Sequence, residues 1–154
     1  MFKRVVVAFF IPFFFTSGSF AALAQSSGPY VEASIGADID FNLAGDINAG
    51  YKINDFFAIE AGGAIYSGSN DNDYLFDLAL KGIFPFANGC NVFAKLGGAE
   101  AHGYHDFETV IYYGVGVGYS FTPNLTGAVQ WNSTTENHKV EAPNLLFVGL
   151  NYSF

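Results

Sequence analysis

The sequence has 154 residues and a formal net charge of −8, and only 13% of it is charged, against roughly 25% in an ordinary soluble domain. Half of the residues are hydrophobic (51%), yet no window reaches the ~18 to 20 uncharged apolar residues of a membrane-spanning helix, which excludes a helical membrane protein. The acidic balance gives no support to nucleic-acid binding, and the single cysteine excludes both an internal disulfide framework and two-cysteine metal motifs.

The N-terminal segment has the order of a secretory signal peptide. Two basic residues are followed by an uncharged, almost wholly apolar run over 5–15, and Ala22-Leu23-Ala24 supplies the small residues of a cleavage site. We therefore predict a cleaved signal peptide over 1–24 and one mature domain over 25–154. Its removal would leave four lysines against the 14 acids of the sequence, so the mature domain is more acidic than the whole chain.

The mature segment alternates apolar residues with polar or small ones at a period of two, which is the pattern of β-strands. Within residues 43–53, for example, Leu43 and Ile47 fall on one face and Asp46 and Lys52 on the other. The eight predicted strands cover residues 31–39, 43–53, 57–66, 74–84, 92–98, 111–121, 125–131 and 144–154. The fifth strand is the weakest, and the pair Gly97-Gly98 predicts a β-bulge in it.

The connections between these strands alternate in length. The compact turns are 54–55, 85–91 and 122–124, and the longer polar loops are 67–73, 101–109 and 133–143, with 40–42 as a short exception. Short turns on one side and longer loops on the other are typical of outer-membrane barrels, whose tilted strands need ~9 to 11 residues to cross the bilayer. The pattern predicts an all-β, eight-stranded, antiparallel up-and-down transmembrane β-barrel.

The bulk of the side chains indicates which face points outward. A lipocalin-like soluble barrel would carry its apolar face inside, whereas a membrane barrel is inverted. The interior of an eight-stranded barrel only just holds side chains. The polar face carries the glycines, and these are Gly36, Gly50, Gly62, Gly114, Gly116, Gly118 and Gly149. We therefore expect the polar, small face inside and the apolar face toward lipid.

Aromatic residues gather near the strand ends, which predicts two interfacial girdles. Those expected toward the short turns are Tyr51, Phe57, Phe84, Tyr119, Phe121 and Tyr152. Those expected toward the long loops are Tyr74, Tyr113 and Trp131.

The last third of the chain resembles a known family. Residues 114–125, with the Val-Gln-Trp sequence at 129–131, resemble strands six and seven of OmpA-type transmembrane domains and their small OmpX/Ail relatives, and 48–54 resembles the second strand and turn. The likeness spans 28–154. It implies a monomeric barrel in a Gram-negative outer membrane, in contact with lipid and lipopolysaccharide, which supports envelope integrity. It also implies adhesion or host interaction through the loops.

The chain's end resembles the C-terminal assembly signal of outer-membrane proteins. In that family the barrel-insertion machinery reads a final aromatic residue and the alternating apolar residues before it. The positions that match are Val148, Leu150, Tyr152 and Phe154.

Five charged residues are expected inside the barrel, and we call them the interior charge belt. Its members are Glu32, Lys52, Glu60, Lys81 and Lys95. Assuming that Tyr66 pairs with Leu75, Glu60 lies opposite Lys81, with Lys95 beside it on the next strand. One interpretation is a salt-bridged plug, and the other is a gated pore or ion site that makes the protein a small-solute or ion channel. We favour the plug, because a narrow barrel has little lumen and paired charges satisfy one another.

Polar loop residues raise two further hypotheses. A divalent-cation site or a pH sensor would use His102, His105, Asp106, Glu108, His138 and Glu141. No tight ligand spacing is present, so we predict solvated loops without metal or cofactor. A lipid A deacylase would use Ser133, Glu136 and His138, but these lie in a loop, so we predict no catalytic residue. Cys90 is predicted to be an incidental residue of a turn.

Overall fold

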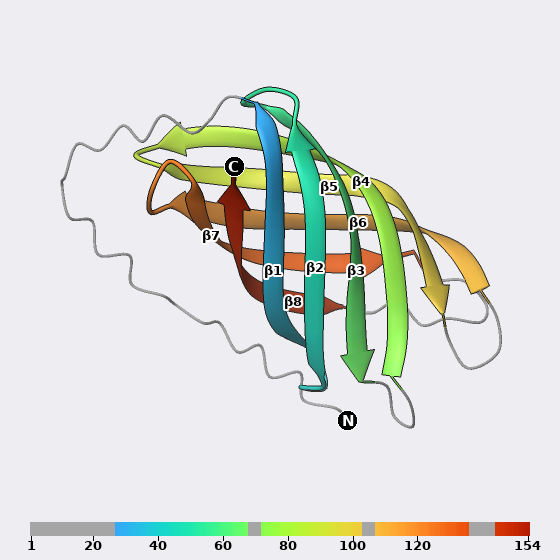
Figure 1. Cartoon of the computed structure of the whole chain (residues 1–154). Helices are drawn as coiled ribbons and strands as arrows, with labels where there is room; N and C mark the ends of the chain where they lie inside the picture. The colour runs from blue at the N-terminus through green and yellow to red at the C-terminus, as the bar shows by residue number, and fades with distance from the viewer. Residues whose placement is uncertain (1–26, 68–71, 103–106, 136–143) are drawn as a thin grey trace.

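The computed structural model describes residues 27–67, 72–102, 107–135 and 144–154 and shows a closed barrel of antiparallel strands (Figure 1). The strands are β1 (Gly28–Asp38), β2 (Leu43–Lys52), β3 (Phe57–Ser67), β4 (Asn72–Ala87), β5 (Cys90–His102), β6 (Phe107–Ser120), β7 (Leu125–Thr134) and β8 (Leu145–Ser153). Each strand pairs with the next, and β8 pairs with β1 to close the barrel. The predicted fold class is confirmed, whereas the predicted signal peptide over 1–24 lies outside the described residues.

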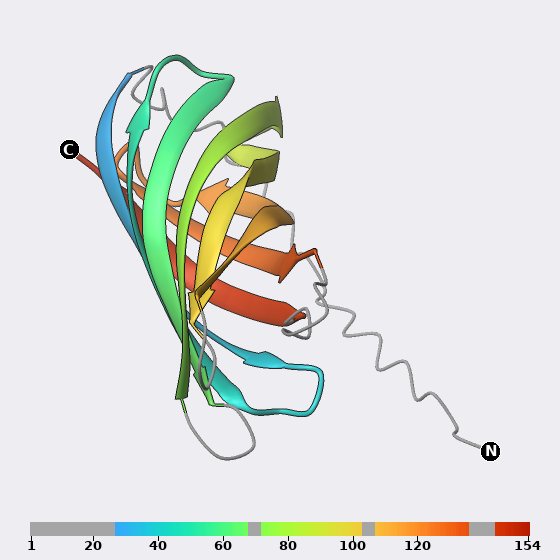
Figure 2. The ribbon, with the colours of Figure 1, turned by 90° about the vertical axis from the view of Figure 1, so that its right-hand side faces the viewer.

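The strands are steeply tilted and twisted. Figure 1 shows β1 to β3 crossing the direction of β5 to β7, and Figure 2 shows the same walls from the side. Tilt and right-handed twist are what close a sheet of this size into a barrel. As a result, residues of β1 and β5, far apart in sequence, face each other across a narrow lumen. Within the described chain, no helix is long and apolar enough to cross a membrane.

The β4–β5 hairpin is longer than predicted, and the expected turn over 85–91 is wrong. The strands continue to Ala87 and resume at Cys90, leaving only Asn88 and Gly89 between them. Both central residues have positive φ, 40° at Asn88 and 83° at Gly89. This is the requirement of a type I′ hairpin, for which Asn-Gly is the preferred sequence. Cys90 is consequently the first residue of a strand rather than a turn residue.

The predicted bulge at Gly97-Gly98 is also wrong. The β4–β5 register runs without interruption there, and its one irregularity lies between Pro85 and Ala87. A Cβ added to Gly97 would collide with the backbone oxygen of Leu78 on the neighbouring strand. Gly97 therefore serves the close approach of two backbones, which the sequence pattern does not distinguish from a bulge.

The polar face is inside and the apolar face is outside, as predicted. Ile47 and Leu96 are 70% and 63% exposed on the outer wall, while Glu60 and Lys95 are 1% and 3% exposed within. The aromatic residues expected toward the short turns are all exposed, as is Tyr74. At the other end Tyr113 and Trp131 pack edge to face, with ring centroids 5.8 Å apart.

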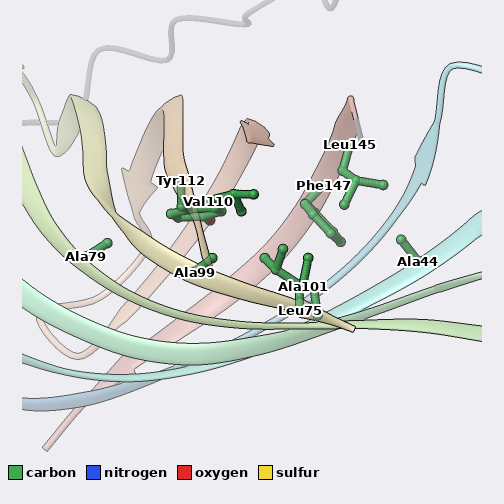
Figure 3. Packing of buried hydrophobic residues seen from close by; sticks show 10 residues of the cluster. Ala44, Leu75, Ala79, Ala99, Ala101, Val110, Tyr112, Leu145 and Phe147 are labelled. Carbon is green, nitrogen blue, oxygen red and sulfur yellow. The ribbon is translucent and has the colours of Figure 1, made fainter. Parts of the chain in front are cut away.

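The interior is not polar throughout, which corrects the sequence-based expectation. Buried apolar side chains pack together inside the barrel, beginning at the long-connection end (Figure 3). We call this cluster the apolar cap, and its members are Ala44, Ala64, Leu75, Ala79, Ala99, Ala101, Val110, Tyr112, Leu145 and Phe147. The sequence hides it because β8 begins with Leu145-Leu-Phe-Val148, which is apolar on both faces.

Candidate functional site

Four charged side chains form a closed ring in the lumen. Lys81 Nζ lies 2.8 Å from Glu60 Oε1 and 3.3 Å from Glu32 Oε2. Lys95 Nζ lies 2.8 Å from Glu60 Oε2 and 3.4 Å from Glu32 Oε1. Each carboxylate therefore contacts both ammonium groups, and all four residues are buried. We call Glu32, Glu60, Lys81 and Lys95 the ion-pair ring.

The strand register explains why the ring needs both acids. Lys81 on β4 and Lys95 on β5 are direct cross-strand partners, an arrangement that repels unless opposite charges intervene. Glu60 on β3 is diagonal to Lys81, since Lys81 pairs with Ala58 two residues away. Glu32 on β1 completes the ring from across the lumen. The barrel must close before these four groups can meet.

The predicted register of β3 and β4 is off by two residues. Tyr66 pairs with Asp73 rather than with Leu75. Glu60 consequently lies opposite Ala79, not opposite Lys81 as expected. The reason is that β3 and β4 extend further into their connection than predicted, with Ser67 already paired to Asn72. Because a shift of two keeps each side chain on its own face, the ion pair forms diagonally instead.

Lys52 belongs to the predicted interior charge belt but not to the ring. It is half-buried and lines a cavity of about 480 Å³ at the short-turn end, together with Tyr30, Asp55 and Lys81. In the described part of the chain no carboxylate lies within 4.0 Å of its ammonium group. The structure thus brings four of the five predicted residues together and leaves Lys52 at the mouth.

The ring has neutral partners that the sequence analysis missed. Tyr30 donates a hydrogen bond to Glu60 Oε1 (2.7 Å), and Gln130 Nε2 donates one to Glu32 Oε1 (2.9 Å). Lys81 Nζ lies 4.4 Å from the centroid of the Phe93 ring, a cation–π distance. The sequence does contain a signal for two of these partners. The period of two places Tyr30 on the same face as Glu32, and it places Phe93 on the same face as Lys95. Alternation marks the inward face of these neutral residues but not which charge each of them contacts.

The residues predicted from the sequence as metal ligands or as a hydrolase site do not join the ring. Ser133 lies on β7 rather than in a loop, and its buried hydroxyl is 3.4 Å from Asn144 Oδ1. The side chains of the predicted loop ligands, and of the two other residues predicted for a lipid A deacylase, lie outside the described part of the chain. They are His102, His105, Asp106, Glu108, Glu136, His138 and Glu141. Among the described side chains, no group of three or more His, Cys, Asp or Glu could hold a metal ion.

Three of the predicted assembly residues lie on β8, the strand that closes the barrel, and Phe154 directly follows it. Val148, Leu150 and Tyr152 are exposed on the outer face of β8, which pairs with β1. The rings of Tyr152 and Phe154 pack edge to face at 5.3 Å, and the Phe154 amide donates to the Pro29 carbonyl at 3.1 Å. The final aromatic residue is thus joined to the start of β1.

Sequence comparison identifies the family. The family model described as outer membrane protein beta-barrel domain matches residues 10–154. The chain belongs to this family. Membership implies the outer membrane as its location, in agreement with the inverted faces of the barrel. No curated protein matches the sequence.

Solved structures of small outer-membrane barrels share the fold at low sequence identity. The N-terminal barrel of Pseudomonas aeruginosa OprF has a TM-score of 0.69 and 19% identity, covering 84% of this chain and 98% of that one. Neisserial surface protein A gives 0.57 and 24% identity, with 84% and 99% covered. Yersinia pestis Ail gives 0.56 and 10% identity, with 83% and 100% covered. The resemblance to the OmpA and OmpX/Ail group is therefore confirmed at the level of the fold.

Removing one member of the ring should cost far more stability than removing the lysine outside it. We expect Lys95→Met to lower the unfolding free energy by about 3–5 kcal/mol, because two buried carboxylates then share one ammonium group. Lys52→Met, the matched control, should cost less than about 1 kcal/mol, because Lys52 is only half-buried and has no carboxylate within 4.0 Å in the described chain. Urea unfolding of the barrel in lipid vesicles measures both. Equal losses for the two variants would contradict the account of the ring.

Proposed function

We propose that the protein is a closed outer-membrane barrel that contributes to envelope integrity and holds polar loops at the cell surface. The observation that carries the proposal is the doubly blocked lumen. The ion-pair ring fills one level with Lys81 and Lys95 bound between two glutamates, and the apolar cap fills another. A barrel filled in this way serves as an anchor rather than as a conduit.

The outer wall supports a partner role for lipid. Large apolar side chains of β1 to β6 and of β8 are exposed, and Trp131 on β7 is half-buried; such a wall is unfavourable in water and favourable against acyl chains. We propose bilayer lipid and lipopolysaccharide as the partners of this wall, around a single copy of the chain. We further propose that Val148, Leu150, Tyr152 and Phe154 are read by the barrel-insertion machinery, since they share one exposed face of the closing strand.

The loops are the proposed site of adhesion or host interaction, and their charge limits the partner. Ail of Yersinia pestis has been crystallised with the heparin analogue sucrose octasulfate. In this chain the segments 39–42, 68–71, 103–106 and 135–144 together carry five acids and one lysine. An acidic loop surface repels sulfated glycans, so we propose a cationic partner instead.

A channel is the second candidate, and one observation favours it. The cavity of about 480 Å³ at the short-turn end reaches Lys81, so solutes from that side have access to the ring. Passage would then require both the ring and the apolar cap to open. Hydrolysis of lipid A is not part of the proposal, because the buried Ser133 hydroxyl faces Asn144.

Conductance separates the anchor from the channel. In planar bilayers the wild-type barrel should show no stable, large openings, because the ring and the cap block the lumen independently. A variant with Glu60, Lys81 and Phe147 all replaced by Ala removes groups from both levels and should pass current. Replacement of Phe147 alone is the control and should stay silent. Stable openings in the wild type would overturn the anchor in favour of the channel.

A deletion strain tests the two parts of the proposal separately. Loss of the protein should increase sensitivity to detergent, and the wild-type gene should restore resistance. A variant whose segments 103–106 and 136–143 are replaced by short Gly/Ser linkers should also restore resistance, while host-cell attachment stays lost. If the linker variant fails in resistance although the barrel is folded, the loops rather than the barrel support the envelope. If deletion changes neither resistance nor attachment, the proposal is wrong.

A further inference from the structure

Two aspartates inside the barrel have no basic partner. Asp46 on β2 and Asp77 on β4 face inward and are only 4% and 8% exposed. Along β4 the inward side chains are Leu75 of the cap, Asp77, Ala79 of the cap and then Lys81 of the ring, so Asp77 lies among residues of the cap on the side that faces the ring. Within the described chain, no basic nitrogen lies within 4.0 Å of either aspartate.

The buried charges of the lumen do not balance. The buried acids are Glu32, Asp46, Glu60 and Asp77, and the buried bases among the described residues are Lys81 and Lys95. Lys95 acts electrostatically on both aspartates, but its ammonium group is already held 2.8 Å from Glu60. An excess of two negative charges remains. Uncompensated charge in a desolvated interior is strongly unfavourable, so the two aspartates must be neutralised, either by protons or by a positive counter-charge.

The surroundings of Asp46 also have more hydrogen-bond acceptors than donors. Asn48 Nδ2 and Gln130 Nε2 both donate to Asp46 Oδ2, at 2.8 Å and 3.4 Å. This leaves Asn48 Oδ1 and Gln130 Oε1 without a donor, on side chains that are 1% and 2% exposed. The environment therefore accepts positive charge at several atoms at once.

The strand register turns the unpartnered amide oxygen toward the second aspartate. Asn48, Gly62 and Asp77 form one row across β2, β3 and β4. Gly62 has no side chain, and Asn48 Oδ1 occupies the place where its Cβ would stand. The backbones of Asn48 and Asp77 are two strand spacings apart, about 9.5 Å. Asn48 Oδ1 is thus directed across Gly62 toward the strand that carries Asp77, and the Asp77 side chain also faces the lumen.

We propose that this layer, formed by Asp46, Asn48, Asp77 and Gln130, binds one hard divalent cation. Ca²⁺ and Mg²⁺ prefer carboxylate and amide oxygens, which are the groups present. A charge of +2 balances both aspartates and can contact all of these acceptors at once, whereas neutralisation by protons needs one proton on each aspartate, and each proton satisfies a single acceptor. Because the cap and the ring enclose the layer, the ion enters as the barrel closes. It is thus a structural ion of the folded lumen.

The test is refolding in detergent with CaCl₂, MgCl₂ or choline chloride at matched ionic strength. After extensive dialysis against buffer without divalent ions, elemental analysis should find one divalent ion per barrel, and the melting temperature should be higher than after refolding in choline. Barrels with no retained ion and equal melting temperatures in all three salts would overturn the proposal.

Three variants locate the site. Asp46→Asn combined with Asp77→Asn should retain no ion and should lose the salt dependence of its melting temperature. It should also melt above the wild type refolded in choline, because the unpaired charge is gone. Asn48→Ala should bind roughly tenfold more weakly, as after loss of a group that holds a metal site together. Asp40→Asn removes an exposed acid and should bind as the wild type does; equal loss of binding in Asp40→Asn would mean surface binding and would overturn the proposal.

Discussion

The ion-pair ring is the interaction on which the rest of the structure depends. Isolating a charge from water costs several kcal/mol, and the attraction within a pair offsets this only when each group has its partners in place. Glu32, Glu60, Lys81 and Lys95 come from β1, β3, β4 and β5, so all four are satisfied only in the closed barrel with its native register. The ring therefore specifies closure as well as filling the lumen.

The surrounding bilayer imposes the complementary constraint. In hydrocarbon no water is available to backbone groups, so strands must pair on both edges, and the pairing of β8 with β1 removes the last free edge. An apolar outer wall and a polar inner wall follow at once from the period of two. The inner wall must then satisfy its own polar groups, and the four charges of the ring are satisfied by one another with the help of Tyr30 and Gln130.

The sequence predicts the number of strands, their direction and the face of each residue, because all three depend on local alternation. It does not predict the register, that is, which residue of one strand pairs with which residue of the next. The β3–β4 register fails by two residues for this reason, and the ring survives because Glu60 keeps its face. The apolar cap is missed because Leu145 and Phe147 alternate with residues that are equally apolar. Asn88-Gly89 is a preferred hairpin-turn sequence, but Pro85 hides it, because a proline within a run favours an early end of the strand.

A double-mutant cycle between Glu60 and Lys95 tests the central claim most directly. Glu60→Gln, Lys95→Met and the double variant would be unfolded by urea in lipid vesicles, and the coupling energy taken from the three losses. If the ring is a cooperative unit, the double variant loses less than the sum of the two single variants, by about 2–3 kcal/mol. Losses that add to within about 0.5 kcal/mol would contradict the account, because the two residues would then act independently.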